Sequence, residues 1–330
     1  MTASPNRRLI AVVLLVPVLV ALALWAFTWP AARTAPRDLP LGVAGPAPAA
    51  AQLEARLAQH DGAFEIHRYA SADEAREAVE HRAVYGAVVA TEHGPELLTA
   101  SAASPVVAQL LREAVTASAP GGTEVPVTDV VAAPAADPRG SVLGSGILPL
   151  AIAGVAAGAV VTLLGLRGGR AATALLGVAA LVGVVAAAVT DSWLGALTGN
   201  WWAEAGALGL TVLAIGAAVA GFAALIGPAG IGIGALLMVL LGNPFSGVTS
   251  APELLPRPVG TIGQWLPPGA GGSLLRSVAY FDGHAASGAV LTLALWSVCG
   301  LAAVLIGGRL RRPAAPAPEA APAREAALAG

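Results

Sequence analysis

The chain has 330 residues, of which 56% are hydrophobic and 12% are charged; an average soluble domain has about 25% charged residues. The formal net charge is −2, so no excess of basic residues favours a nucleic-acid partner. The single Cys excludes an internal disulfide framework and a multi-cysteine metal site. These figures predict a membrane protein.

Residues 1–30 contain the first apolar segment. It is long enough to cross a bilayer, which takes about 20 apolar residues. Arg7 and Arg8 precede it, and Trp25 and Trp29 lie at its far end, where aromatic side chains favour the membrane interface. A cleaved signal peptide is the alternative, but its apolar region has only about 7–15 residues. Both interpretations place the residues that follow on the outside.

Residues 31–142 differ in composition from the rest of the chain. The range 31–140 carries 8 Arg and 14 Asp or Glu, a net charge of −6. Its hydrophobic pattern alternates between strands and helices, which predicts a small extracytoplasmic α/β domain inserted between the first two membrane helices. The expected strands are Leu39–Gly45, Phe64–Tyr69, Val84–Ala90, Glu96–Ala100 and Val125–Val131, and the expected helices are Ala49–Gln59, a helix from Ser71 to about His81, and Ser104–Ser118.

No motif in the chain indicates an enzyme. The sequence has no HExxH, GxSxG or Walker A pattern. The histidines of the polar region, His60, His67, His81 and His93, match no zinc spacing, so solvated surface residues are the simpler interpretation and a metal site is the alternative. We therefore expect no enzymatic activity, no cofactor and no metal.

Residues 143–308 contain five further apolar segments of roughly membrane length. They are Gly146–Leu166, Ala171–Thr190, Ala205–Leu225, Ile226–Gly242 and Ala285–Gly307. Together with the first segment they predict a polytopic α-helical membrane protein with six transmembrane helices. Within these bounds no segment carries an ionisable group, which argues against a proton relay.

Small residues recur at helical spacing inside these segments. Gly154 and Gly158 are four apart, as are Gly230 and Gly234, a spacing that lets helix backbones approach closely. We expect close packing within one subunit; a dimer interface is the alternative.

Arginine placement predicts the orientation, because cytoplasmic loops are enriched in basic residues. With six spans both termini lie on one side, and the short loop with Arg167 and Arg170 lies there too. The cluster Arg309, Arg311 and Arg312 follows the last span on the same side. We assign that side to the cytoplasm and name these five arginines as candidate docking residues for a cytoplasmic partner. Residues 309–330 are rich in Ala, Pro and Glu and are expected to form a disordered cytoplasmic tail.

Residues 243–284 form a proline-broken apolar segment on the outer side. Six prolines exclude a continuous helix, and a broken backbone cannot face lipid. The segment is therefore expected to dip into the outer leaflet against protein or to lie along it. A short amphipathic helix is expected over Gly272–Phe281, with Arg276 facing outward. The polar and aromatic residues of this segment could form a substrate gate, and the alternative is that they anchor the segment at the membrane surface. They are Glu253, Arg257, Trp265, Arg276, Asp282 and His284.

Two stretches carry a resemblance to a known family. The first is SADEAREAVEHRAVYGAVVA, from Ser71 to Ala90, which reads as a charged helix followed by Gly and an apolar strand. The second is NPFSGVTSAPELLP, from Asn243 to Pro256, which follows the fifth span. With the order of spans, outer domain and broken segment, they make the chain resemble the ABC-2-type permease superfamily, and within it the phage-infection-protein (Pip)-like branch. The resemblance covers most of the chain.

The resemblance implies a function in export across the bacterial cytoplasmic membrane. Permeases of this superfamily are half-transporters, so it implies a homodimer or a sister permease, contact with membrane lipids and a separate ABC ATPase. The outer-leaflet segment suggests amphipathic or lipid-like substrates. The chain departs from the family in its short cytoplasmic loops, which leave little surface for an ATPase. A non-transporting membrane scaffold or binding protein, with its function in the outer domain, is therefore the alternative.

Overall fold

The computed structural model describes residues 5–57, 59, 62–92, 94–118 and 125–310. Most of these residues are helical, and five helices among them are long and apolar enough to cross a membrane. The chain thus has the architecture of a multi-pass membrane protein. These helices are α1 (Pro5–Ala31), α5 (Ser141–Leu163), α6 (Gly168–Ala187), which continues into η2 (Ala188–Trp193), α7 (Trp201–Ile226) and α11 (Ser287–Leu310).

A shorter apolar helix corresponds to the predicted span Ile226–Gly242. It begins as α8 (Ala229–Ala235) and continues as η3 (Leu236–Gly242). At 1.5 Å per residue, its 14 residues would cover about 21 Å of a hydrocarbon core that is about 30 Å thick. The sixth crossing therefore stays a prediction.

Five strands form one mixed sheet in the order β2-β1-β3-β4-β5. β1 runs parallel to both β2 and β3, β4 is antiparallel to β3, and β5 is parallel to β4. The strands are β1 (Leu39–Ala44), β2 (Phe64–Tyr69), β3 (Gly86–Thr91), β4 (Gly94–Thr99) and β5 (Val127–Asp129). The helices between them are α2 (Ala47–Leu57), α3 (Ala72–Glu80) and α4 (Pro105–Ser118). The predicted succession of strands and helices is confirmed, with shifts of a few residues at the ends.

Helix α3 begins with the capping arrangement that its sequence predicts. The Ser71 hydroxyl accepts a hydrogen bond from the Glu74 backbone N–H at 3.1 Å, and the Glu74 carboxylate accepts one from the Ala70 N–H at 2.9 Å. These bonds satisfy N–H groups that have no partner inside the helix, so they fix where α3 begins.

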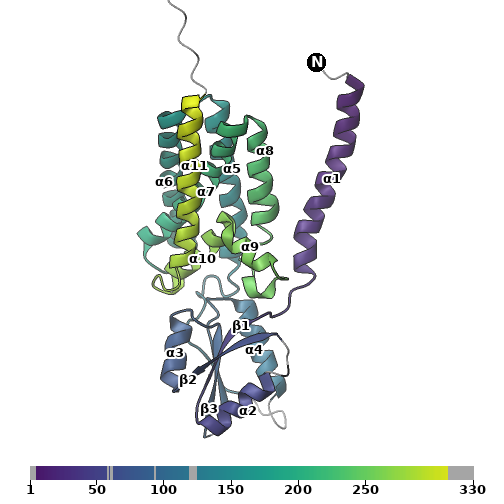
Figure 1. The fold of residues 1–330 in the computed structure, drawn as a ribbon. Helices are drawn as coiled ribbons and strands as arrows, with labels where there is room; N and C mark the ends of the chain where they lie inside the picture. The colour runs from purple at the N-terminus through teal and green to yellow at the C-terminus, as the bar shows by residue number, and fades with distance from the viewer. Residues whose placement is uncertain (1–4, 58, 60–61, 93, 119–124, 311–330) are drawn as a thin grey trace, which may run out of the picture.

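Helix α7 forms the centre of the membrane bundle, with α5, α6 and α11 packed around it (Figure 1). Glycines make this close packing possible. A Cβ on Gly158 of α5 would lie 2.6 Å from the Gly216 carbonyl oxygen of α7, and one on Gly234 of α8 would lie 2.8 Å from the Val219 side chain. The expected packing of these glycines within one subunit is confirmed.

Helix α1 stands apart from the bundle (Figure 1), and only 6% of its apolar window is buried. It is anchored at its end near the sheet, where Trp29 packs against a cluster of Phe245, Leu255 and Val259. Figure 1 places the start of α1 and the end of α11 at the end of the helices that faces away from the sheet.

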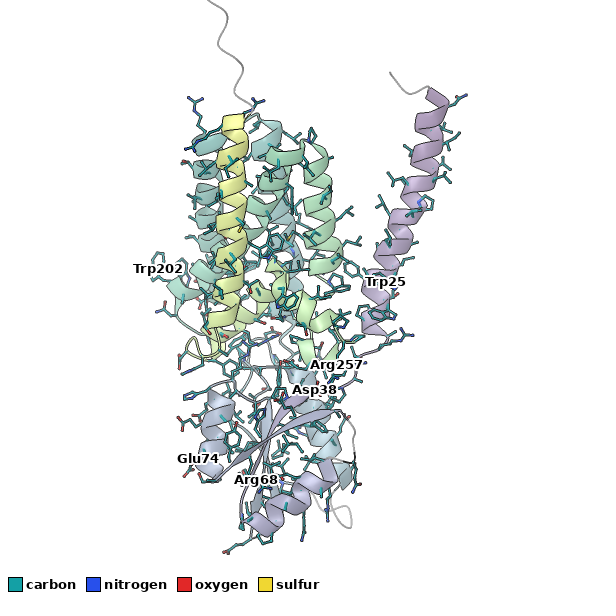
Figure 2. All side chains as sticks on the ribbon, in the orientation of Figure 1. Trp25, Asp38, Arg68, Glu74, Trp202 and Arg257 are labelled. Atoms are coloured by element: carbon teal, nitrogen blue, oxygen red, sulfur yellow. The ribbon has the colours of Figure 1, made fainter. Side chains whose placement is uncertain are left out.

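The sheet packs against the proline-broken segment, which forms η4 (Pro252–Leu254), α9 (Val259–Trp265) and α10 (Pro267–Tyr280). Leu254 and Phe281 belong to the hydrophobic core of the sheet. The Ala35 N–H donates to the Leu254 carbonyl at 3.0 Å, and Arg257 forms an ion pair with Asp38 (Figure 2). The broken segment therefore lies against protein, which is the contact that the first of its two expected placements requires.

The predicted outward direction of Arg276 is wrong. Arg276 is only 5% exposed, and its Nη2 donates to the Val248 carbonyl at 2.8 Å. Helix α10 begins at Pro267, earlier than the expected Gly272, and packs against α7, α11 and α5. Because protein covers several faces of α10, the face that its sequence pattern assigns to water is buried.

Candidate functional site

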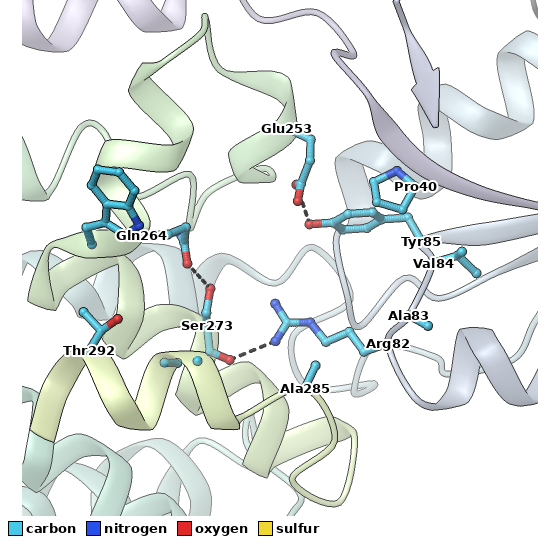
Figure 3. Close-up of a pocket in the computed structure, with 13 residues that line it drawn as sticks. Pro40, Arg82, Ala83, Val84, Tyr85, Glu253, Gln264, Ser273, Ala285 and Thr292 are labelled. Atoms are coloured by element: carbon cyan, nitrogen blue, oxygen red, sulfur yellow. Dashed lines mark hydrogen bonds between the residues drawn. The ribbon is translucent and has the colours of Figure 1, made fainter. Parts of the chain in front are cut away.

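A cavity of ≈ 500 Å³ lies where the sheet meets the broken segment and the start of α11 (Figure 3). Four parts of the chain that are distant in sequence form it. They are the start of β1, the connection from α3 to β3, the stretch from η4 to α10, and the first turns of α11 with the residue Ala285 before them. The lining residues used below are Arg82, Tyr85, Glu253, Gln264, Trp265 and Ser273, with Ala285, Gly288, Ala289 and Thr292 on the side of α11.

The sheet side of the cavity depends on a left-handed turn after α3. Arg82 has φ 59°, a conformation that is uncommon for a residue other than glycine. Three residues later the Tyr85 N–H donates to the Pro40 carbonyl at 3.0 Å, just before β3. The connection therefore turns sharply off α3, and Arg82 reaches from the sheet towards α10 (Figure 3).

Arg82 joins the sheet to α10. Its Nη1 donates to the Ser273 carbonyl at 2.9 Å and to the Ser277 hydroxyl at 2.7 Å. Neither Nη2 nor Nε of Arg82 has a hydrogen-bond partner within the described part of the chain. Arg82 thus holds the two halves together and keeps donors free beside the cavity.

Tyr85 and Glu253 form the second link between the halves. The Tyr85 hydroxyl donates to Glu253 Oε2 at 2.8 Å across the junction (Figure 3). Tyr85 is 9% exposed, so this bond is made in a poorly solvated place, where an ionised acceptor strengthens it.

The broken segment holds its own polar groups in a chain of hydrogen bonds. The Ser273 hydroxyl donates to Gln264 Oε1 at 2.7 Å, and Gln264 Nε2 donates to the Ser246 carbonyl at 2.8 Å. From helix α11, Trp296 Nε1 donates to the Trp265 carbonyl at 2.8 Å. These bonds fix α9 against α10 and α11, so this wall of the cavity is preformed.

Burial and neighbouring charge shift the ionisation of the cluster. Burial lowers the pKa of the Arg82 guanidinium. Burial, followed by repulsion from Arg82, lowers the pKa of Arg276 to about 10. Burial and the nearby carboxylate of Glu253 raise the pKa of the Tyr85 hydroxyl. All three directions reflect a site that is short of water, and the lowering at Arg276 also reflects repulsion between two neighbouring guanidinium groups.

The structure gathers only part of the predicted outer-leaflet set. Glu253 and Trp265 line the cavity, and Arg276 lies close enough to Arg82 and Glu253 to interact with their charges. Arg257 instead pairs with Asp38 on the link from α1 to β1.

The last two predicted residues lie beyond the cavity. His284 stacks on His81, with ring centroids 4.0 Å apart, and Asp282 is exposed in a turn with φ 49°.

Sequence reasoning missed Arg82 and Tyr85, the two residues that the sheet contributes. Both stand within the stretch Ser71–Ala90: Arg82 is in the short connection between the expected helix and the expected strand Val84–Ala90, and Tyr85 is the second residue of that strand. Side chains at such connections are often placed for binding, because a rigid helix and strand hold both ends. That position was the available signal, but nothing in the sequence shows which part of the chain they face.

The predicted cytoplasmic arginines lie at the far end of the bundle. Arg167 and Arg170 are at the start of α6, and Arg309 is in the last turn of α11. A Cβ on Gly308 would lie 2.7 Å from the backbone N of Gly168, so these helix ends are in direct contact. Arg311, Arg312 and the predicted disordered tail beyond residue 310 lie outside the described residues.

Two acidic residues, Glu204 and Asp191, lie within membrane helices because these helices extend beyond their predicted bounds. Helix α7 begins at Trp201 rather than Ala205, which includes Glu204 in its first turn. Glu204 is fully buried; its Oε1 accepts from the Gly199 N–H at 2.8 Å, and its Oε2 has no partner among the described residues. Asp191 likewise falls in η2 at the end of α6. Both residues lie just outside the predicted spans Ala171–Thr190 and Ala205–Leu225, so the shifted helix boundaries bring them into the helices.

Within the described ranges, no three His, Cys, Asp or Glu side chains gather as a metal would require. The cavity offers guanidinium, carboxylate, hydroxyl and amide groups, which can hold a ligand by charge and hydrogen bonds. Comparison with protein-family models, with curated proteins and with solved structures gave no match.

Proposed function

We propose that the chain is an ABC-2-type permease-like subunit of an exporter for amphipathic or lipid-like substrates, working as a dimer or with a sister permease and driven by a separate ATPase. Under this proposal it spans the bacterial cytoplasmic membrane six times, with α8–η3 as the fifth crossing. Both termini are cytoplasmic, and residues 31–142 lie outside.

The cavity is the observation that carries this proposal. One side presents Arg82, Glu253 and Gln264, and the side of α11 presents Ala285 and Ala289. A site with a polar side and an apolar side, next to the start of a membrane helix, suits a ligand with a polar head and an apolar body.

Exposed tryptophans support the placement of the membrane boundary near the cavity. Trp25 of α1 is 50% exposed and Trp202 of α7 is 73% exposed. Figure 2 shows both at a similar level along the helices, on the side of the sheet. Tryptophan favours the interface between lipid and water, which supports a cavity at the outer membrane surface.

The alternative function is a non-transporting membrane protein that binds its ligand outside. The short connections at the far end favour it. Only residues 164–167 join α5 to α6, and Gly227 and Pro228 join α7 to α8. An ATPase would have to dock on the helix ends with Arg167, Arg170 and Arg309.

A pull-down of the full chain in mild detergent, followed by mass spectrometry, tests the exporter proposal. We expect an ABC ATPase with the native chain and its loss with Arg167→Ala, Arg170→Ala and Arg309→Ala combined. The control combines Arg56→Ala, Arg76→Ala and Arg112→Ala, which removes the same charge from the sheet region. Recovery of the chain alone, or of cell-envelope proteins only, would contradict the exporter and favour the alternative.

A further inference from the structure

The charges around the cavity do not balance. Arg82, Arg276 and Glu253 lie close enough to interact electrostatically, and two guanidinium groups beside one carboxylate leave one formal positive charge in excess. No ion pair joins Glu253 to either arginine in the described structure. A buried positive charge without a counterion is unfavourable, so the site gains by accepting an anion.

The two arginines differ in what they can offer to a ligand. Arg276 is 5% exposed and is committed to the Val248 carbonyl, so it contributes charge but no accessible donor. Arg82 lines the cavity, and among the described residues hydrogen-bond partners, Ser273 and Ser277, are found only for its Nη1. The remaining N–H groups of Arg82 form the fork that suits phosphate or carboxylate oxygens.

Glu253 has the opposite effect on an anion. Tyr85 holds one of its carboxylate oxygens at 2.8 Å, which fixes the carboxylate on the wall facing Arg82 (Figure 3). Its negative charge compensates only one of the two arginines. Removing that charge should therefore strengthen the binding of an anion, whereas removing the charge of Arg82 should weaken it.

We propose that this cavity binds the headgroup of an amphiphile with a net negative charge, with Arg82 as the residue that contacts its phosphate or carboxylate. Gly288 and Ala289, at the start of membrane helix α11, and Ala285, just before it, line the side on which the apolar part lies. The inference deepens the proposed function, on which it rests, by naming the charge class of the ligand.

Binding is measured on the full chain purified in dodecylmaltoside, by the shift of the thermal unfolding midpoint during titration. The probes are dihexanoyl phosphatidylglycerol, which carries one negative charge, dihexanoyl phosphatidylcholine, which carries none, and inorganic phosphate. We expect phosphatidylglycerol to bind about tenfold more tightly than phosphatidylcholine, the size of one charge-assisted contact. Inorganic phosphate should bind more weakly than phosphatidylglycerol, because it lacks the apolar part.

Four variants separate the contact from general charge effects. Arg82→Gln should lose the preference for phosphatidylglycerol, and Arg82→Lys should keep most of it. Glu253→Gln keeps an acceptor for Tyr85 and should bind phosphatidylglycerol several times more tightly. Arg112→Gln removes an exposed arginine of α4 and should behave as the native chain.

Equal affinity for the two lipids would overturn the inference, as would unchanged binding by Arg82→Gln or weaker binding by Glu253→Gln. Equal binding of phosphate and phosphatidylglycerol would replace the amphiphile by a free anion. If Arg82→Gln does not fold, Glu253→Gln and Arg82→Lys still decide the outcome. Recovery of the ATPase together with equal lipid affinities would reject this inference alone, whereas lipid selectivity without an ATPase would reject only the exporter.

Discussion

Arg82, in the left-handed turn after α3, lies close enough to the buried Arg276 of α10 to interact with its charge across the junction between the sheet and the broken segment. The sequence singled out Glu253, Trp265 and Arg276, because charged and aromatic residues in a proline-broken apolar segment are conspicuous. It did not single out Arg82 and Tyr85, because a polar domain contains many such residues. What distinguishes these two is the packing of the sheet on the broken segment, a long-range contact that local patterns do not encode.

The bond from Tyr85 to Glu253 gives a prediction for a single residue. Tyr85→Phe removes the hydroxyl that donates to Glu253 Oε2 and leaves the carboxylate without that partner. Loss of a hydrogen bond to a charged group costs about 1.5–3 kcal/mol. We expect a lower thermal unfolding midpoint in detergent at pH 7. Tyr69→Phe, on β2, is the control and should change the midpoint little. Equal losses in both variants would show that the bond from Tyr85 to Glu253 does not itself stabilise the fold.

Tyr85 also makes the stability of the native chain depend on pH, because its pKa is raised in the folded state. Below the ordinary tyrosine pKa of about 10, both states keep the proton and pH has no effect through this group. Above it, only the unfolded state releases the proton, so stability falls as pH rises, by up to about 1.4 kcal/mol per pH unit. Part of the alkaline loss should therefore disappear in Tyr85→Phe. An identical slope in both proteins would contradict this assignment.

At the scale of the element, periodicity predicted the sheet region better than the membrane region. Helix α3 follows its pattern, because Ala75, Ala78 and Val79 face the core while its acidic residues face water. Strand β1 follows its apolar run, because it is buried along nearly its whole length. Helix α10 does not, since it packs against α5, α7 and α11 at once. An amphipathic pattern predicts an outward face only where water covers that face, which is why Arg276 was misplaced.

The contact between α6 and α7 has a glycine on each helix, Gly183 and Gly209. A Cβ on Gly183 would lie 2.3 Å from the Ala205 carbonyl oxygen and 2.9 Å from the Gly209 nitrogen, both backbone atoms that cannot rotate away. Gly183→Ala should separate the helices and cost about 1–3 kcal/mol by overpacking. We expect a clear fall in the thermal unfolding midpoint of the purified chain.

Gly177 supplies the matched control on the same helix. Nothing lies within 4 Å of a Cβ built there, and the residue is exposed. Gly177→Ala should leave the midpoint unchanged or raise it slightly, because alanine favours a helix more than glycine does. Similar losses for both variants would show that helix propensity, and not the crossing with α7, decides the result.

For the whole molecule, composition alone predicted a multi-pass helical protein, because several apolar segments of about 20 residues each match the thickness of the hydrocarbon core. Composition could not predict that α1 would stand apart while α7 is buried, since both are equally apolar. Burial depends on which helices carry small residues at their crossings, as Gly158 and Gly216 do. Nor could composition place the sheet directly on α10, because that docking joins residues far apart in the chain.

The orientation across the membrane gives the last prediction. The sheet lies at one end of the helices, and the connection from α5 to α6 lies at the other (Figure 1). After Cys299→Ser, which removes the exposed native thiol, a membrane-impermeant maleimide should label Glu113→Cys on α4 in intact cells. Gly169→Cys on α6 should react only after permeabilisation, because the arginines beside it favour the cytoplasm. Both positions are exposed in the structure, so accessibility to the reagent reports the side of the membrane. Labelling of Gly169→Cys in intact cells would invert the orientation, place the cavity in the cytoplasm and remove the basis for export through the outer leaflet.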